Sequence, residues 1–400
     1  MKKTLCDVQT KRKHSIALSP LVFTLTLAFL WLTFTGHAQN FQQTDTQTAD
    51  VFNMDDEFGT SVSISGNYAV VGAPEHDEDV SGGNNISNAG AVYIFKNDGA
   101  GNWAFHQKIV SPARNISDQF GGSVSIAGDY IIVGANLADS NPATNLNSNE
   151  GAAYVFKRNT GSDQWVILGA PLVVANADQF GISVAITNTG DAFVGANAED
   201  EDASDGDFKD GAGSAYFYRW DGTNWNMKQK IVASDREQFE SFGSSLAVSG
   251  NFLVIGAQAE DVSTIGDNFG AAYVYQFNSS TEQWDEFTKL TAPTADRSTS
   301  DAFGVSVAID GDWIVVGANF DDEKDDTGTD GSPLDNAGAA YVFKYDGTSW
   351  NYTKKLVAGV RAAADNFGVR VSISGENILI SAQAEDEDEN EDNTINNAGS

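Results

Sequence analysis

A short pattern that recurs six times constrains the fold of this chain more than any other feature. A Phe-Gly pair is followed by an alternating stretch and then by Gly-Ala, as in DQFGGSVSIAGDYIIVGANLAD at residues 118–139. The pairs are separated by 60 to 64 residues and stand at 58–59, 120–121, 180–181, 242–243, 303–304 and 367–368. This regular period indicates a repeat architecture, which overrides the two or three domains that 400 residues would otherwise suggest.

Each period predicts four strands, shown here for the second copy. Residues 123–126 alternate between apolar and polar side chains, as in a half-buried strand, and 127–129 form a tight turn. Residues 130–133 are a continuous apolar run, which is typical of a strand buried on both faces. After a long polar loop, residues 151–157 form a third strand, and a fourth begins near Trp165. Matching fourth strands are expected near Trp103, Trp225, Trp284 and Trp350.

Four antiparallel strands at a fixed period, without helices, predict an all-β chain folded as a β-propeller of four-stranded blades. A solenoid of stacked β-units is the alternative, but the turns fall at hairpin spacing and the four strands differ in character. The Gly-Ala pairs let backbones approach near the central channel. We expect each Phe of a Phe-Gly pair to fill the space between neighbouring blades, and the Trp to cover the outer side.

The end of the sequence falls inside a repeat. Residues 396–400 match residues 335–339, so the chain stops within the third strand of the sixth unit. Because propellers close their ring, we expect the six units to belong to a seven-bladed propeller. An incomplete gene product is the alternative. Residues 39–55 are a candidate strand for the closing blade, and residues 56–400 are the propeller repeats.

The charge of the chain excludes some partners. It carries 23 basic and 56 acidic residues, a net charge of −33. Nucleic acid and anionic lipid both require basic surface, so we expect neither as a partner. Cations are the natural small partners of such a surface, although acidic residues more often serve solvation.

The N-terminus has the features of an export signal. A basic stretch precedes the apolar run at 21–35, and Gly36-His37-Ala38 predicts cleavage after Ala38. A retained membrane anchor is the alternative. We expect residues 1–38 to be a signal peptide and the mature chain to be secreted or at the cell surface, without insertion in the membrane. The single cysteine, Cys6, lies in this signal, so the mature chain would have no disulfide.

The repeated residues resemble the FG-GAP repeat. The resemblance rests on Phe-Gly-x-Ser-Val-x-Ile, on Gly-Ala with Pro74 in the first copy, and on Gly-Ala-x-Tyr-Val/Ile-Phe, and it covers about residues 50–400. This family builds the seven-bladed propeller of integrin α-subunits and of related bacterial surface proteins. Calcium-binding members carry an Asp-x-Asp-x-Asp-Gly loop between the two motifs. Here short turns such as 127–129 and 310–312 stand in its place, so those calcium sites are not expected.

Three polar positions recur between the motifs. An Asp stands four residues after each Gly-Ala, an acid stands two residues before each Phe, and an Asn usually stands two residues before the Gly that opens the third strand. Asp and Asn hold turns by bonding to backbone amides, which is the expectation we favour. The aspartates are Asp77, Asp139, Asp200, Asp261, Asp322 and Asp386. The acids are Asp56, Asp118, Asp178, Glu240, Asp301 and Asp365, and the asparagines are Asn88, Asn149, Asn268, Asn336 and Asn397.

A cation site is the alternative role for the loops between strands two and three. Calcium prefers several carboxylates and carbonyls, and the two most acidic loops offer both. We therefore name calcium as a candidate ligand, with a solvated acidic rim as the competing interpretation. The candidate ligands are Asp200, Asp202, Asp205, Asp207, Asp321, Asp322, Asp325 and Asp326.

Catalysis finds little support in the sequence. The predicted mature chain has only two histidines, His76 and His106, no cysteine, no Gly-x-Ser-x-Gly motif and no phosphate-binding loop. We therefore predict a non-catalytic, exported propeller that binds an extracellular protein or glycan through loops on one face. The alternatives are an accessory propeller of a larger secreted enzyme, with its catalytic part beyond residue 400, and an enzyme within the propeller itself.

Overall fold

The computed structural model describes residues 56–139, 149–174, 178–204, 206–261, 268–322, 334–359 and 361–385. All of these residues belong to Asp45–Ser400, the second of the two units into which the chain divides. The predicted signal at 1–38, the candidate closing strand at 39–55 and the third strand of the sixth unit lie outside the described residues.

The described residues form five four-stranded antiparallel sheets and one two-stranded sheet, each with its strands side by side in chain order. The first three sheets are β1 (Val62–Ser65), β2 (Tyr68–Ala73), β3 (Ala91–Asn97) and β4 (Trp103–Ile109); β5 (Ser123–Ala127), β6 (Tyr130–Ala135), β7 (Ala152–Asn159) and β8 (Gln164–Ile167); and β9 (Ser183–Ile186), β10 (Ala192–Ala196), β11 (Ser214–Trp220) and β12 (Trp225–Ile231).

The other three sheets follow in the same way. They are β13 (Phe242–Ser249), β14 (Phe252–Ala257), β15 (Ala271–Asn278) and β16 (Gln283–Leu290); β17 (Ser306–Asp310), β18 (Trp313–Ala318), β19 (Ala339–Tyr345) and β20 (Trp350–Leu356); and β21 (Phe367–Ser374) with β22 (Asn377–Ala382). One short 3-10 helix, η1 (Thr294–Asp296), interrupts a linker between sheets.

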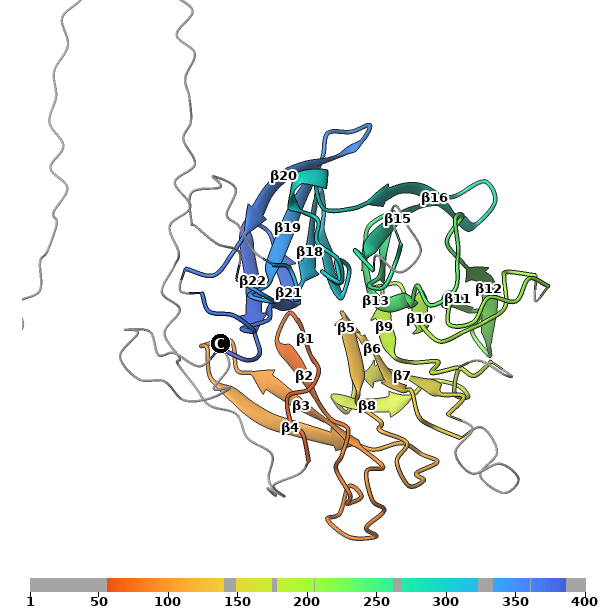
Figure 1. Ribbon diagram of the computed structural model, residues 1–400. Coiled ribbons are helices and arrows are strands. Elements are labelled where there is room, and N and C mark those ends of the chain that lie inside the picture. The colour runs from red at the N-terminus through yellow and green to blue at the C-terminus, as the bar shows by residue number, and fades with distance from the viewer. Residues whose placement is uncertain are drawn as a thin grey trace, which may run out of the picture. The chain divides into compact units, whose positions relative to one another are not determined.

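The sheets are the blades of a β-propeller, as the repeat predicts. The first strand of each blade packs against the first strand of the next, from β1 through β5, β9, β13 and β17 to β21. Figure 1 shows these strands toward the centre and the fourth strands β4, β12, β16 and β20 toward the outside. The all-β fold and the four strands of each complete unit are therefore confirmed. A seven-bladed ring remains a prediction.

Close backbone contacts join each blade to the next. Gly151, which opens the third strand of the second blade, forms a parallel bridge with Phe180 of the third. The Ser123 hydroxyl donates to the carbonyl of Gly181 at 2.8 Å. A Cβ atom added to Gly134 would lie 2.0 Å from the same carbonyl oxygen. This confirms that the Gly-Ala glycine is needed for close approach between blades.

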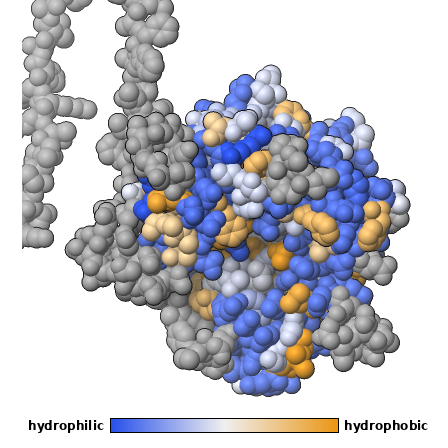
Figure 2. All heavy atoms as spheres, viewed as in Figure 1, coloured by the Kyte–Doolittle hydropathy of each residue, from blue (hydrophilic) through white to orange (hydrophobic). Residues whose placement is uncertain are grey.

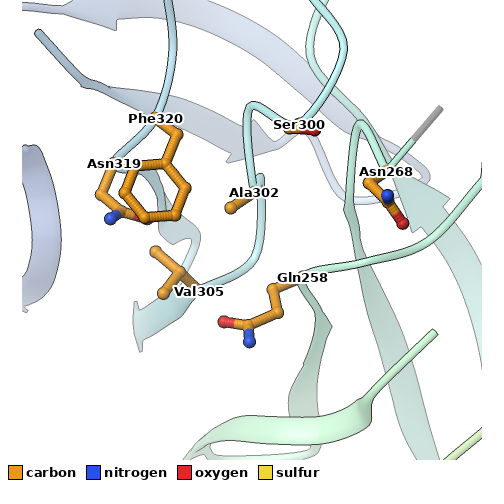
Figure 3. A pocket seen from close by; sticks show the side chains of 7 residues that line it. All are labelled: Gln258, Asn268, Ser300, Ala302, Val305, Asn319 and Phe320. Atoms are coloured by element: carbon orange, nitrogen blue, oxygen red, sulfur yellow. The ribbon is translucent and has the colours of Figure 1, made fainter. Parts of the chain in front are cut away.

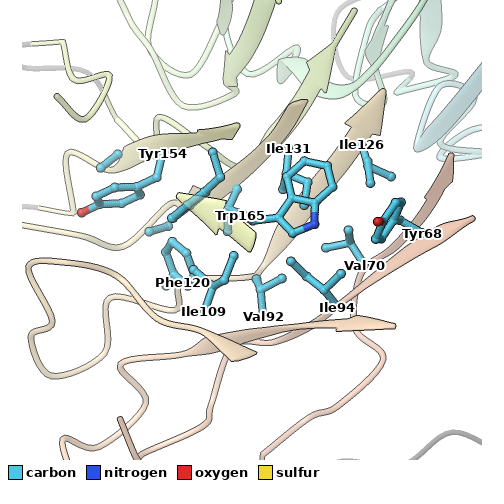
Figure 4. Packing of buried hydrophobic residues seen from close by; sticks show 14 of the residues in the cluster. Tyr68, Val70, Val92, Ile94, Ile109, Phe120, Ile126, Ile131, Tyr154 and Trp165 are labelled. Atoms are coloured by element: carbon cyan, nitrogen blue, oxygen red, sulfur yellow. The ribbon is translucent and has the colours of Figure 1, made fainter. Parts of the chain in front are cut away.

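Aromatic side chains fill the space between blades. Figure 4 shows Phe120 of the second blade beside Ile109 and Val92 of the first. All three belong to one core cluster, and Phe120 is fully buried, as predicted. The tryptophan position differs from the expectation. Trp165 is 2% exposed and packs edge-on against Tyr68 of the preceding blade, so it seals the junction between two blades rather than covering the outside.

Candidate functional site

One end of the blades carries all the long connections. Because the strands alternate in direction, the loops between strands two and three emerge at the same end as the linkers between blades. We call this end the loop face. The described residues of its loops are 74–90, 136–139, 149–151, 197–204, 206–213, 258–261, 268–270, 319–322 and 334–338, and those of its linkers are 110–122, 168–174, 178–182, 232–241, 291–305, 357–359 and 361–366. The opposite end carries only the short turns.

The repeated aspartate holds the loop that follows it. In each of the five blades where it is described, its Oδ1 accepts a hydrogen bond from a backbone amide at the repeated Asn position. That residue has a positive φ of 47° to 59°, which Asn and Gly tolerate better than other residues. The bonds are Asp77 to Asn88 at 2.8 Å, Asp139 to Asn149 at 3.2 Å, Asp200 to Gly211 at 2.7 Å, Asp261 to Asn268 at 2.9 Å and Asp322 to Asn336 at 3.0 Å. The turn-holding role is confirmed.

A linker arginine holds the same loop from the other side. Arg236 donates to the carbonyl oxygen of Asp200, and to that of Asp207 at 3.0 Å. Arg114 makes the same pair of bonds in the first blade, to Asp77 and, at 2.9 Å, to Asn84. Because the guanidinium occupies carbonyls of the acidic loop, it competes directly with any cation for these oxygens.

The acid before each Phe lies under the linker. The backbone amides of Asn115 and Ser298 donate to Asp118 at 2.8 Å and to Asp301 at 2.6 Å. Burial raises the pKa of Asp118 to about 6 and that of Asp301 to about 7, and it raises the pKa of Glu240 to about 8. These carboxyls are 1% exposed, so they support the linker from inside.

A second set of buried acids stands three residues after the Gly-Ala pair of the third, fourth and fifth copies, as Glu199, Glu260 and Asp321, and its pairing with lysine was missed in the sequence. Lys230 lies 3.2 Å from Glu199, whose other oxygen accepts from the Tyr216 hydroxyl at 3.0 Å. The fourth blade pairs Lys289 with Glu260. Burial raises the pKa of Glu199 to about 7, against the attraction of Lys230. The signal was a repeated Lys one residue before the end of the fourth strand, as at Lys108, Lys230, Lys289 and Lys355.

In the first blade a histidine takes the place of this acid. His76 is 0% exposed, and its Nδ1 lies 2.9 Å from the Asp56 carboxylate. Its Nε2 lies 2.6 Å from the Lys108 ammonium, and burial lowers the pKa of that lysine. A fully buried imidazole cannot reach a substrate. The other histidine, His106, contacts the carbonyl of Asp163 at 2.6 Å within a junction between blades.

Five of the eight candidate calcium ligands lie in the described residues, and they do not converge. Asp200 and Asp322 hold the backbone amides already described. Asp202 accepts from the amides of Ser204 and Gly206, which lowers its pKa to about 2. Asp207 faces Arg236 at 3.6 Å.

The fifth ligand, Asp321, is 1% exposed and lies between Lys355 at 2.9 Å and the Tyr341 hydroxyl at 2.5 Å. Within the described ranges, no group of three or more His, Cys, Asp or Glu side chains could hold a metal ion. Asp205, Asp325 and Asp326 lie outside those ranges. Calcium binding by these loops remains a prediction.

Six of the large exposed apolar side chains among the described residues lie on the loop face, and the others lie in the strands. Among the described residues, the short turns at the opposite end carry no large exposed hydrophobic side chain. The loops and linkers carry several, from 43% to 71% exposed, namely Val80, Ile116, Val173, Phe208, Phe239 and Phe320. Figure 2 shows a face of the molecule that is mostly hydrophilic, with small separate apolar patches. In the part of the chain that the structure describes, no helix is long and apolar enough to cross a membrane.

Comparison with known proteins identifies the repeat but no function. No curated protein matches the sequence. Solved structures with similar folds include a functionally unknown protein from Desulfotomaculum acetoxidans (14% identity, 81% of this chain and 74% of that chain, TM-score 0.43). Two others are Sqt1 from Saccharomyces cerevisiae (8%, 83% and 82%, 0.42) and a protein from Lactobacillus plantarum (12%, 85% and 84%, 0.45). These values carry no argument about function.

The family comparison is more informative. A family described as FG-GAP repeat matches residues 41–95, 103–156, 225–275, 284–343 and 350–400, which is more than half of the chain. These segments contain the Phe-Gly pair of every copy except the third, whose motifs at 180–181 and 195–196 lie between the matched segments. The chain belongs to the FG-GAP repeat family.

Proposed function

We propose that this chain is an exported, non-catalytic binding module that holds an extracellular protein or glycan on its loop face. The placement of the exposed apolar side chains carries the proposal. Phe208, Phe239 and Phe320 are 63%, 60% and 43% exposed, and all three lie on the loop face. Exposed apolar groups rimmed by polar residues favour contact with a partner.

The contrast between recurring residues and variable loops within each repeat supports the same function. Residues that recur in every copy support the blade, since they hold turns, join blades or pair buried charges. The loops between strands two and three differ in length and sequence from copy to copy. Variable loops on a fixed scaffold are the usual arrangement of a binding surface. His76 is the side chain whose type best suits acid–base catalysis, and it is fully buried.

Binding to immobilised ligands tests the proposal. The full-length chain is passed over panels of extracellular matrix proteins and neutral glycans, and each bound ligand is recovered and analysed by mass spectrometry. We expect saturable binding and recovery of an unchanged ligand. Recovery of a cleaved or modified ligand would instead support an enzyme, and failure to bind any member of either panel would contradict the proposal.

A further inference from the structure

A hollow of about 390 Å³ lies on the loop face where the fourth and fifth blades meet. Figure 3 shows its lining from three segments. Gln258 and Asn268 come from the ends of the loop after β14, and Ala302 comes from the linker. Asn319 and Phe320 follow β18. The volume is near the lower end of the roughly 300–1,000 Å³ that small-ligand sites occupy.

One buried polar group in this lining lacks a partner. Asn319 is 5% exposed, and its Oδ1 atom makes no hydrogen bond within the described residues. Buried polar atoms almost always have a partner, because a buried polar atom without one is destabilising. Asn197, at the same position of the third blade, has the same unpaired Oδ1, so this feature is shared by two blades.

Two side chains distinguish this junction from the others. Ala302 immediately precedes the Phe of the fifth unit, where the other described copies carry Glu57, Gln119, Gln179, Ser241 and Asn366. All six residues share a positive φ of 52° to 60°, so the backbone is the same and only the side chain is shorter here. Phe320 stands where three other copies have alanine, at Ala198, Ala259 and Ala384. The junction therefore combines a missing side chain with an added aromatic ring.

The chemistry of the lining selects a class of ligand. Gln258, Asn268 and Asn319 each offer one amide donor group and one acceptor, which matches hydroxyl groups that also donate and accept. Phe320 offers an apolar ring for the carbon face of a ligand. Among the described residues, no charged side chain lines the hollow, and the net charge of −33 disfavours anionic ligands.

We infer that this hollow is a binding site for a neutral sugar, whose hydroxyl groups bond to the three carboxamides and whose ring lies against Phe320. The inference rests on the proposed function and gives it a location and a ligand class. A peptide segment is the competing ligand, because its amides also match carboxamides.

Two variants and one control test the site. Phe320→Ala installs the residue that three other copies already carry. Ala302→Gln installs the residue of two other copies at the same backbone conformation, and its longer side chain fills the hollow. Phe105→Ala is the matched control, since Phe105 is 41% exposed but lies on the outer strand β4. Binding of the full-length chain to a panel of neutral mono- and oligosaccharides is measured, with thermal unfolding as a check on folding.

We expect the unchanged chain to bind at least one neutral sugar. Phe320→Ala and Ala302→Gln should each weaken that binding about tenfold or more, while Phe105→Ala leaves it unchanged. Sugar binding that survives both loop-face variants would overturn this site but leave the binding function standing. Binding of proteins or peptides without any neutral sugar would have the same meaning. Absence of every ligand would contradict both proposals.

Discussion

The Lys355 ammonium lies 2.9 Å from the Asp321 carboxylate, and both side chains are at most 2% exposed. The pair joins the end of the second strand to the fourth strand of the same blade. Burial raises the pKa of Asp321, and the charge of Lys355 opposes that rise. A buried charge that loses its partner is strongly destabilising.

Lys355→Met therefore tests whether these pairs support the blade. We expect the free energy of unfolding to fall by about 3–5 kcal/mol, because Asp321 would be left as an uncompensated buried charge. Lys354→Met is the matched control, since Lys354 is exposed. Denaturant unfolding measures both variants, and an equal small effect would show that the buried pair contributes little.

The Gly of the Gly-Ala pair is required because the backbone of the next blade lies too close to leave room for a side chain. In Gly134→Ala the new Cβ atom would lie 2.0 Å from the Gly181 carbonyl oxygen of the next blade, so the blades must separate. We expect destabilisation of about 1–3 kcal/mol or more. Gly83→Ala is the control, because its nearest neighbour would be 4.0 Å away. Comparable thermal unfolding of the two variants would contradict the close approach between blades.

The buried acids before each Phe predict a pH dependence. The pKa of Asp301 is raised to about 7 by burial and by the charges of Asp321 and Asp322. The folded chain therefore binds more protons than the unfolded chain between about pH 4 and pH 7, and stability falls as pH rises through that window.

Asp301→Asn removes this contribution because an amide does not titrate there. We expect the unchanged chain to lose more stability than the variant between pH 5 and pH 8, as measured by the denaturant midpoint. Parallel pH profiles for the two proteins would show that Asp301 does not titrate in this range.

The loop aspartates separate turn-holding from calcium binding. Asp200→Ala removes the bond to the Gly211 amide, which should cost about 1 kcal/mol and speed hydrogen exchange of that amide. If Asp200 only holds the turn, the loss is the same in calcium and in excess chelator. A loss seen only in calcium would contradict this account and place the cation in the loop.

The sequence predicted the features set by periodicity and local chemistry, and it missed contacts between side chains that are distant in the sequence. The strands, the turn-holding Asp200 and the glycine contact at Gly134 follow from periodicity and local chemistry. Glu199 lies in a run of acidic residues, so nothing in its local sequence marks it as buried. Its partner Lys230 lies in β12, two strands further along the chain. The burial of Trp165 depends on Tyr68 of the preceding blade, which its own repeat does not reveal.

The hollow beside Asn319 was missed for a similar reason. It needs residues from two loops and one linker, and its distinguishing side chains, Ala302 and Phe320, look ordinary by themselves. Only the comparison of equivalent positions around the propeller shows that one junction is different.

One measurement tests the central claim that the loop face binds the partner. Val80, Ile116, Phe208, Phe239 and Phe320 are replaced together by Ser in one variant. The control replaces five exposed side chains of the fourth strands, Phe105, Val166, Ile167, Met227 and Tyr352. Circular dichroism confirms that both fold, and binding to the protein and glycan panels is compared. The account predicts that only the loop-face variant loses binding. Retained binding in that variant, or loss in the control alone, would contradict it.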